Sequence, residues 1–292
     1  MYWQCPTLFA AESGVTYDKT YPGFMNSKIW PYLEVGDDPV RRWHTIVASY
    51  TRLNLTYAND RLPAIAAIVE REMRLRPDDT YIAGIWKSSL LTDISWQRGG
   101  FLDDGFPVAR LGEHVPTWAW PTSNTKVHWF KGKIERSVKL VDLSFTRIGP
   151  AQVGQVLNAS ITLEGHTYKT RLTQVCHPEY NGLQPRIELV SPACEEFNKV
   201  THYLLEDFDW RTGDRRVRAG DTLLVMPIKF FGDRRNPSSF GILLYEVANG
   251  DFERMGVLEL RMKTEAETYG VEAERILRNF IDALPIRQVK II

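Results

Sequence analysis

The chain of 292 residues is poor in cysteine and has no excess of charge of either sign. Its cysteines, Cys5, Cys176 and Cys194, are too few and odd in number for the disulfide framework of a small secreted domain, so we expect reduced thiols. Thirty-six basic residues balance thirty-six acidic residues, and the chain therefore lacks the overall positive field that attracts nucleic acid. We expect no nucleic-acid partner.

Long apolar runs are also missing from the sequence. No segment approaches the roughly 18 apolar residues that a helix needs to cross a bilayer. The first residues, MYWQCPTLFAAESG, do not contain the charged region and apolar core of a secretory signal. These absences predict a cytoplasmic protein without a membrane partner.

Sequence signatures of metal and cofactor sites are absent as well. There is no phosphate-binding Gly-rich loop, HExxH, GxSxG or CxxC pair. The nearest approach to a metal-binding set has a spacing that matches no usual zinc pattern, and adjacent side chains on a strand point to opposite faces. This set consists of Cys176, His177, Cys194 and His202. We expect no metal and no cofactor.

Two histidines are the remaining candidates for acid–base chemistry. Neither His44 nor His128 has a serine, cysteine or carboxylate at a spacing that defines a catalytic triad. Neighbours in space cannot be read from the sequence. We therefore expect no catalytic residue and a protein that is not an enzyme.

The first part of the chain reads as irregular structure followed by helices. Proline and glycine interrupt residues 1–36, and Asp38 before Pro39 is a typical helix start, followed by a helical apolar stripe. A second helix is expected over residues 62–73, with Pro63 in its first turn and Pro77 beyond its end. Its polar face is expected to hold Glu70, Arg71, Glu72 and Arg74. Apolar residues at every fourth position predict a third helix within residues 79–96.

From about residue 118 the pattern changes to short alternating segments. Residues 222–231 predict a central strand with a bulge or a sheet edge at Pro227. Asn249-Gly250 predicts a tight turn between strands at 240–247 and 252–262. Further strands are expected at 137–145, 156–163 and 167–175, the last two forming a hairpin across Glu164-Gly165. A helix is expected from about residue 265 to 283.

Together these patterns predict an α+β fold. A helical subdomain packs on a β-rich antiparallel subdomain, sheet or barrel-like, and a C-terminal helix follows. The expected boundaries are 1–36 irregular, 37–98 helical, 99–117 linker, 118–264 β-rich, and 265–292 C-terminal helix and tail.

Three of the nine tryptophans lie in VPTWAWPTSNTKVHWF (115–130). On a strand, Trp118 and Trp120 would share one face and could form a two-ring platform for a sugar. A buried tryptophan, however, removes about 200 Å² from water, and this segment lies at the boundary between the helical and β-rich parts. We therefore expect a structural role at that boundary, together with Trp43 and Trp86 on the apolar stripes of the helical part.

Two arginine pairs are candidate binding residues for an anion. The sequence Gly-Asp-Arg-Arg occurs twice and places Arg215, Arg216, Arg234 and Arg235 in loops. The strand expected between the loops spans about 33 Å, which puts the two pairs at opposite ends rather than in one clamp. The alternative is that these arginines are solvated turn charges.

Several segments resemble one family. The segments WHTIVASYTRLNLTYANDRLPAIAAIVE (43–70), DTYIAGIWKSSLLTDISW (79–96) and VPTWAWPT (115–122) resemble the region downstream of the HET domain in fungal heterokaryon-incompatibility proteins. GQVLNASITLEG (154–165) and FGILLYEVANGDFERMGVLEL (240–260) are similar to a strand pair and a hairpin of that region. MYWQCPTLFAAE (1–12) resembles the closing piece of the HET domain itself, and most of that domain has no counterpart here.

The resemblance implies a role in fungal non-self recognition and programmed cell death. It implies a non-catalytic accessory region, scaffold or regulator, whose partner is another protein or the HET effector domain. No catalytic residue is carried over, because the HET motifs themselves are missing. The alternative is a ligand-binding β module for a glycan or nucleotide that uses exposed tryptophans or the arginine pairs.

Overall fold

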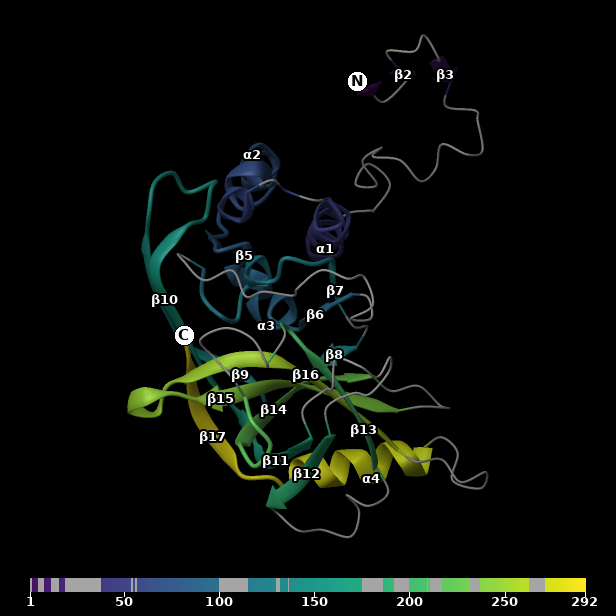
Figure 1. Cartoon of the computed structure of the whole chain (residues 1–292), viewed down its shortest axis with the longest axis vertical. Coiled ribbons are helices and arrows are strands. Elements are labelled where there is room, and N and C mark those ends of the chain that lie inside the picture. The colour runs from purple at the N-terminus through teal and green to yellow at the C-terminus, as the bar shows by residue number, and fades with distance from the viewer. Residues whose placement is uncertain are drawn as a thin grey trace.

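A large, mostly antiparallel sheet forms the centre of the computed structural model, with helices on both sides of it (Figure 1). Helices from the first part of the chain lie on one side, and the C-terminal helix lies on the other. This confirms the α+β fold class expected from the sequence. Structure is described for residues 2–4, 8–11, 16–18, 38–53, 55, 57–99, 115–129, 132–135, 137–174, 186–191, 200–208, 210, 217–231, 237–262 and 271–292.

Helix α1 (Pro39–Tyr50) begins where its capping sequence predicts. The Asp38 carboxylate accepts the backbone N–H groups of Val40 and Arg41, and Pro39 fits the first turn because no N–H is needed there. The helix buries the face that the periodicity indicated, which consists of Trp43, Ile46 and Val47.

Helix α2 (Ala66–Leu75) follows a 3₁₀ turn at Pro63–Ile65 and ends before Pro77, as predicted. The prediction for Glu72 is wrong, because this residue is buried rather than on the polar face. Its carboxylate accepts hydrogen bonds from two nitrogens of the Arg42 guanidinium of α1, at 3.0 and 3.1 Å, so the charge is paired between the helices.

The prediction of a helix along residues 79–96 is wrong. A tight hairpin occupies its start, with Ala83 (φ 50°) and Gly84 (φ 93°) in left-handed conformations that no α-helix contains. Residues four apart lie on the same face of a strand as well as on the same face of a helix. Apolar residues at every fourth position therefore fit both structures. The elements formed are β4 (Tyr81–Ile82), β5 (Ile85–Trp86), a 3₁₀ turn (Lys87–Ser89), the single-turn helix α3 (Leu90–Asp93) and β6 (Trp96–Arg98).

The strand order of the large sheet is β12-β11-β14-β15-β16-β17-β10-β9, with β13 also paired to β16 and β8 to β14. Neighbours are antiparallel except β16 and β17, which meet in parallel at one residue pair. The strands are β8 (Lys133–Ile134), β9 (Lys139–Arg147), β10 (Val156–His166), β11 (Tyr168–Gln174), β12 (Arg186–Ser191), β13 (Val200–Glu206), β14 (Thr222–Phe231), β15 (Ser238–Glu246), β16 (Phe252–Met262) and β17 (Ile286–Ile291).

Two local predictions for the sheet are confirmed. Strands β15 and β16 form an antiparallel hairpin around Asn249 (φ 68°) and Gly250 (φ 77°). In β14 the pairing register with β15 shifts between Pro227 and Lys229, which is the expected bulge. A proline cannot donate to the ladder, and the bulge lets the strand continue past it.

The expected hairpin between residues 156–163 and 167–175 is wrong. Strand β10 continues through Gly165 to His166 and pairs with β9 and β17, whereas β11 pairs with β12 and β14. Gly165 serves packing rather than a turn, because a Cβ there would lie 3.2 Å from Val138. The backbone N–H of Thr167 instead donates to Pro285 at the end of the C-terminal helix.

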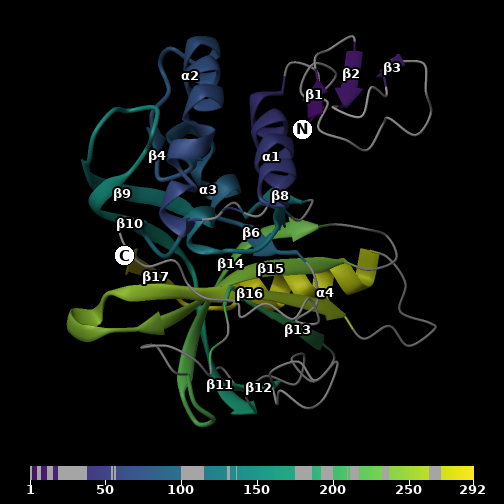
Figure 2. The same ribbon diagram turned by 45° about the horizontal axis from the view of Figure 1, so that its top comes forward.

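Strand β14 is apolar on both faces because both faces are covered. Leu224, Met226 and Ile228 belong to the core cluster shared with the helical part. Leu223, Val225 and Phe230 belong to the cluster formed with α4 (Val271–Asp282). Figure 2 shows α4 lying across the face of β15 and β16 that is turned away from α1 and α3.

Both ends of the chain add strands. The C-terminal tail forms β17 beside β10, with Val289 and Ile291 buried, which the sequence did not indicate. In the first 36 residues the described elements are the short strands β1 (Tyr2–Gln4), β2 (Leu8–Ala11) and β3 (Thr16–Asp18), which form a small antiparallel sheet. Residues 100–114 of the expected linker lie outside the described residues.

None of the helices in the described ranges is long and apolar enough to span a membrane.

We expect the helical part and the sheet to unfold together. Trp43 and Ile85 belong to the same core cluster as Leu224 and Met226, so neither part keeps a closed core without the other. In a urea titration, far-UV circular dichroism and tryptophan fluorescence should give one coincident transition. Two separate transitions would contradict a shared core.

Candidate functional site

The segment VPTWAWPT (115–122), here named the junction segment, lies between the helical part and the sheet. The exposed fractions of Trp118 and Trp120 are 1% and 0%, and Trp43 and Trp86 are also fully buried. The segment is not a strand, because Trp120 begins a short 3₁₀ turn. No ligand can stack on either ring, since solvent does not reach them.

Three of the buried indoles at this junction, those of Trp43, Trp96 and Trp120, donate hydrogen bonds to backbone carbonyls. The indole N–H groups of Trp43 and Trp120 both donate to the carbonyl of Gly84, at 3.1 and 2.6 Å. The indole of Trp96 donates to the carbonyl of Trp118 at 3.0 Å. The hairpin β4–β5, helix α1 and the junction segment are therefore tied at one point.

Thr117 connects the junction segment to the sheet. Its backbone N–H donates to the carbonyl of Ile292 at 3.1 Å, and its hydroxyl accepts the backbone N–H of Arg254 at 3.1 Å. Ile292 in turn donates to the carbonyl of Phe252 at 2.9 Å. The end of the chain and the start of β16 thus meet at this segment.

Arg254 of β16 is a fully buried charged group at this boundary, with an exposed fraction of 0%. Its guanidinium donates twice to the Asp207 carboxylate, at 2.8 and 3.1 Å. It also donates to the carbonyls of Ile94 and Trp96 and lies 3.9 Å from the ring centroid of Trp96. One side chain from the sheet therefore satisfies backbone acceptors in the helical part while a carboxylate balances its charge.

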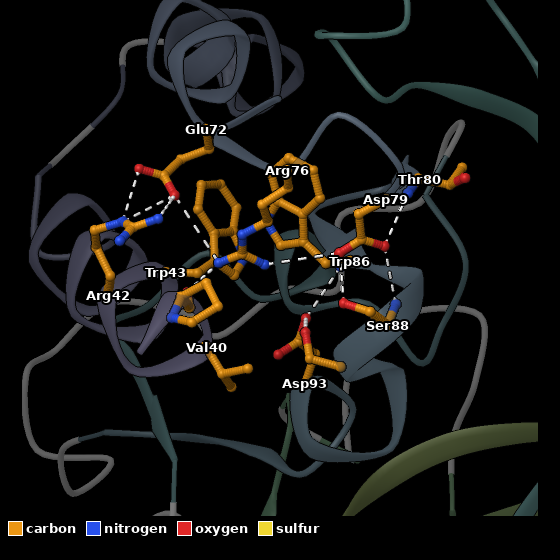
Figure 3. A network of polar contacts seen from close by, with 12 residues as sticks. Val40, Arg42, Trp43, Glu72, Arg76, Asp79, Thr80, Trp86, Ser88 and Asp93 are labelled. Carbon is orange, nitrogen blue, oxygen red and sulfur yellow. Dashed lines mark hydrogen bonds and ion pairs between the residues drawn. The ribbon is translucent and has the colours of Figure 1, made fainter. Parts of the chain in front are cut away.

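A second polar cluster, here named the ion-pair network, lies inside the helical part (Figure 3). The Arg76 guanidinium lies over the ring of Trp86, 4.6 Å from its centroid, with Glu72 and Asp79 each 3.9 Å away. Burial lowers the pKa of the Arg76 guanidinium, and the Glu72 carboxylate acts in the opposite direction. The network consists of Arg42, Glu72, Arg76, Asp79 and Asp93.

His44 forms a close pair with the buried Asp93, 49 residues away in the sequence. Its Nε2 lies 2.7 Å from one carboxylate oxygen, and the other oxygen accepts bonds from the Trp86 backbone and the Ser89 hydroxyl. The imidazole stacks on Trp129 at 3.9 Å between ring centroids, and the Trp129 indole donates to the Asp93 carbonyl. No signal in the sequence connects these residues.

A carboxylate that orients an imidazole is one half of a general-base arrangement. In the described part of the chain, no serine, threonine or cysteine is hydrogen-bonded to His44. The ring is instead held between Asp93 and Trp129, so the pair links α1 to α3 and to β7 (Val127–Trp129). This geometry is that of a structural clamp.

Two further bases near this region have lowered pKa values, the buried Lys229 and the half-buried His128. Burial lowers the pKa of the Lys229 side chain on β14 to about 8, and the negative charge of Asp93 opposes this shift. Burial also lowers the pKa of His128, to which Lys126 adds a smaller effect, and the ring contacts Gln97. His128 is therefore half-buried and in contact with a neighbouring side chain.

The other residues singled out from the sequence cannot be placed. Arg215, Arg216, Arg234 and Arg235 lie outside the described residues, as do Cys176, His177 and Cys194. His202 lies in β13, where only the backbone is described. Within the described ranges, no group of three or more histidine, cysteine or acidic side chains is arranged to hold a metal ion.

Comparison with known proteins gives no assignment. No family model, no curated protein and no solved structure matches the chain.

We expect Arg254→Met to lower the free energy of unfolding by about 3–5 kcal/mol, because it leaves the Asp207 carboxylate buried without its partner. Arg74→Met is the matched control, since Arg74 pairs with Glu70 on the surface and its side chain is 75% exposed. The control should change stability by less than about 0.5 kcal/mol. Urea denaturation measures both, and equal losses would contradict the assigned role of Arg254.

Gly84→Ala should also destabilise the fold. A Cβ at Gly84 would lie 2.6 Å from the indole nitrogen of Trp120, so the ring must move, at a cost of about 1–3 kcal/mol beyond the backbone strain. Gly220→Ala is the control, because Gly220 has a similar φ of 100° and nothing within 4 Å of its Cβ position. If both variants lose the same stability in thermal unfolding, packing against Trp120 is not what requires glycine.

Proposed function

We propose that this chain is a non-catalytic scaffold or regulatory region of a fungal heterokaryon-incompatibility-type protein, acting in non-self recognition and programmed cell death. In this proposal the helical part and the sheet form one rigid body whose outer surface binds a protein partner or the HET effector domain. The observation that carries it is the burial of the junction segment together with Arg254. Aromatic and charged groups that would bind a ligand are used internally there.

The motifs that carry the family resemblance support this proposal, because they converge in space. Trp43 comes from the first motif, Gly84 from the second, Trp120 from the third, and Arg254 from the last. The first three meet at one carbonyl, and Arg254 contacts the same boundary through Trp96. A folded unit shared by a family needs the same contacts in each member. Motifs that are far apart in the sequence but build one junction meet this need, whichever partner the unit binds.

The ligand-binding alternative had two candidate sites, the tryptophans and the arginine pairs, and the burial of the tryptophans speaks against the first. A glycan platform at Trp118 and Trp120 needs exposed rings, and these rings are closed off from solvent. The form that uses the two arginine pairs stays a prediction, since those residues lie outside the described residues. No contact in the described part of the chain favours it over the scaffold.

The proposal is tested by co-expressing a HET effector domain with this chain in a filamentous fungus and scoring cell death. We expect the wild-type chain to change the death frequency and the chain alone to cause none. Arg254→Met should lose the effect because it weakens the junction, and Arg74→Met should retain it. An unchanged death frequency with and without the wild-type chain would refute a regulatory role.

A further inference from the structure

Strand β9 is an edge strand of the large sheet. It pairs with β10 along one side, and no other strand of the described chain pairs with its second side. Figure 2 shows β9 and β10 next to each other at one margin of the sheet. An edge of this kind presents a row of backbone donors and acceptors that can pair with another strand.

Apolar side chains along this edge are only partly covered. Leu140, Leu143 and Phe145 pack against the core cluster that β9 shares with the helical part, yet all three remain half-buried. Val141 is 48% exposed at a bulge in the strand. The side chains of a further strand along β9 would pack beside these half-buried groups, which gives the pairing an apolar contribution.

The regular part of β9 runs from Asp142 to Thr146, where its register with β10 is unbroken. An antiparallel copy of this strand centred on Ser144 would place Leu143 opposite Phe145 on the core face. On the outer face it would place Asp142 opposite Thr146 and the two Ser144 hydroxyls opposite each other. Apolar groups then meet apolar groups, and polar groups meet polar groups.

Neighbouring registers match less well. Centring the pair on Phe145 would put Leu143 opposite Arg147, and centring it on Leu143 would bring the bulge at Val141 into the paired stretch. Centring it on Asp142 would put two carboxylates opposite each other. Lysine and arginine balance aspartate and glutamate over the chain, so no net repulsion separates two copies.

We propose that two copies of this chain associate by antiparallel pairing of their β9 strands about a two-fold axis at Ser144. The pairing continues the sheet from one copy into the other. The bulge at Val141 ends the regular stretch on one side, and the two-fold axis limits the assembly to two chains. This proposal does not depend on the function proposed above.

The test uses two exposed positions on the same face of β9. Sedimentation velocity of the full chain up to about 0.2 mM should show a reversible monomer–dimer equilibrium. Ser144→Lys places two lysines opposite each other and should raise the dimer dissociation constant about fivefold. Thr146→Lys is the matched control, because it faces Asp142 of the second copy and should leave the constant unchanged or lower it.

A mixture of two variants tests the position of the axis. Ser144→Lys and Ser144→Glu should each dimerise weakly alone, and an equal mixture should associate more tightly than either, since lysine then faces glutamate. A chain that stays monomeric over the whole concentration range would overturn the proposal. A dimer that is insensitive to both Ser144 variants would also overturn it, because the contact would then lie elsewhere.

Discussion

The rest of the structure depends on one fully buried charge, the guanidinium of Arg254. Its pairing with Asp207 removes the cost of an isolated ion, and its remaining donors serve backbone carbonyls of the helical part. A salt bridge on the surface would tolerate small displacements because water can replace either partner. Water does not reach the buried pair of Arg254 and Asp207 and cannot replace either partner. The pair therefore holds the sheet and the helical part in a single relative position.

The aromatic groups around Arg254 also fix the position of the helical part relative to the sheet. Trp43 and Trp120 share the carbonyl of Gly84, and the left-handed conformation of that glycine leaves room for the Trp120 ring. Large rings contribute apolar burial, and their N–H groups fix the geometry through directed bonds. The helical part, whose longer helices in the described ranges are α1 and α2, thereby shares one core with the sheet.

The His44–Asp93 pair and the ion-pair network are both engaged in contacts within the fold. The His44 and Asp93 pair has the chemistry of a general base, but stacking on Trp129 makes it part of the packing. Arginines in the ion-pair network are likewise occupied by carboxylates and aromatic rings. The recognition that we propose is therefore assigned to outer surfaces, and among the described strands the side of β9 that pairs with no other strand is the surface proposed to bind a second copy.

By itself, the sequence determined the features that depend on near neighbours. The cap at Asp38, the turn at Asn249 and the bulge at Pro227 follow from backbone preferences acting over a few residues. The burial of Trp118 and Trp120 could be predicted from the size of their rings and from their position between the helical and the β-rich parts of the sequence. Only the tertiary structure decided which strands pair with β10 and which charges meet, as for Arg254 and Asp207, 47 residues apart. Such contacts bring distant segments together, and no local preference encodes the choice of partner.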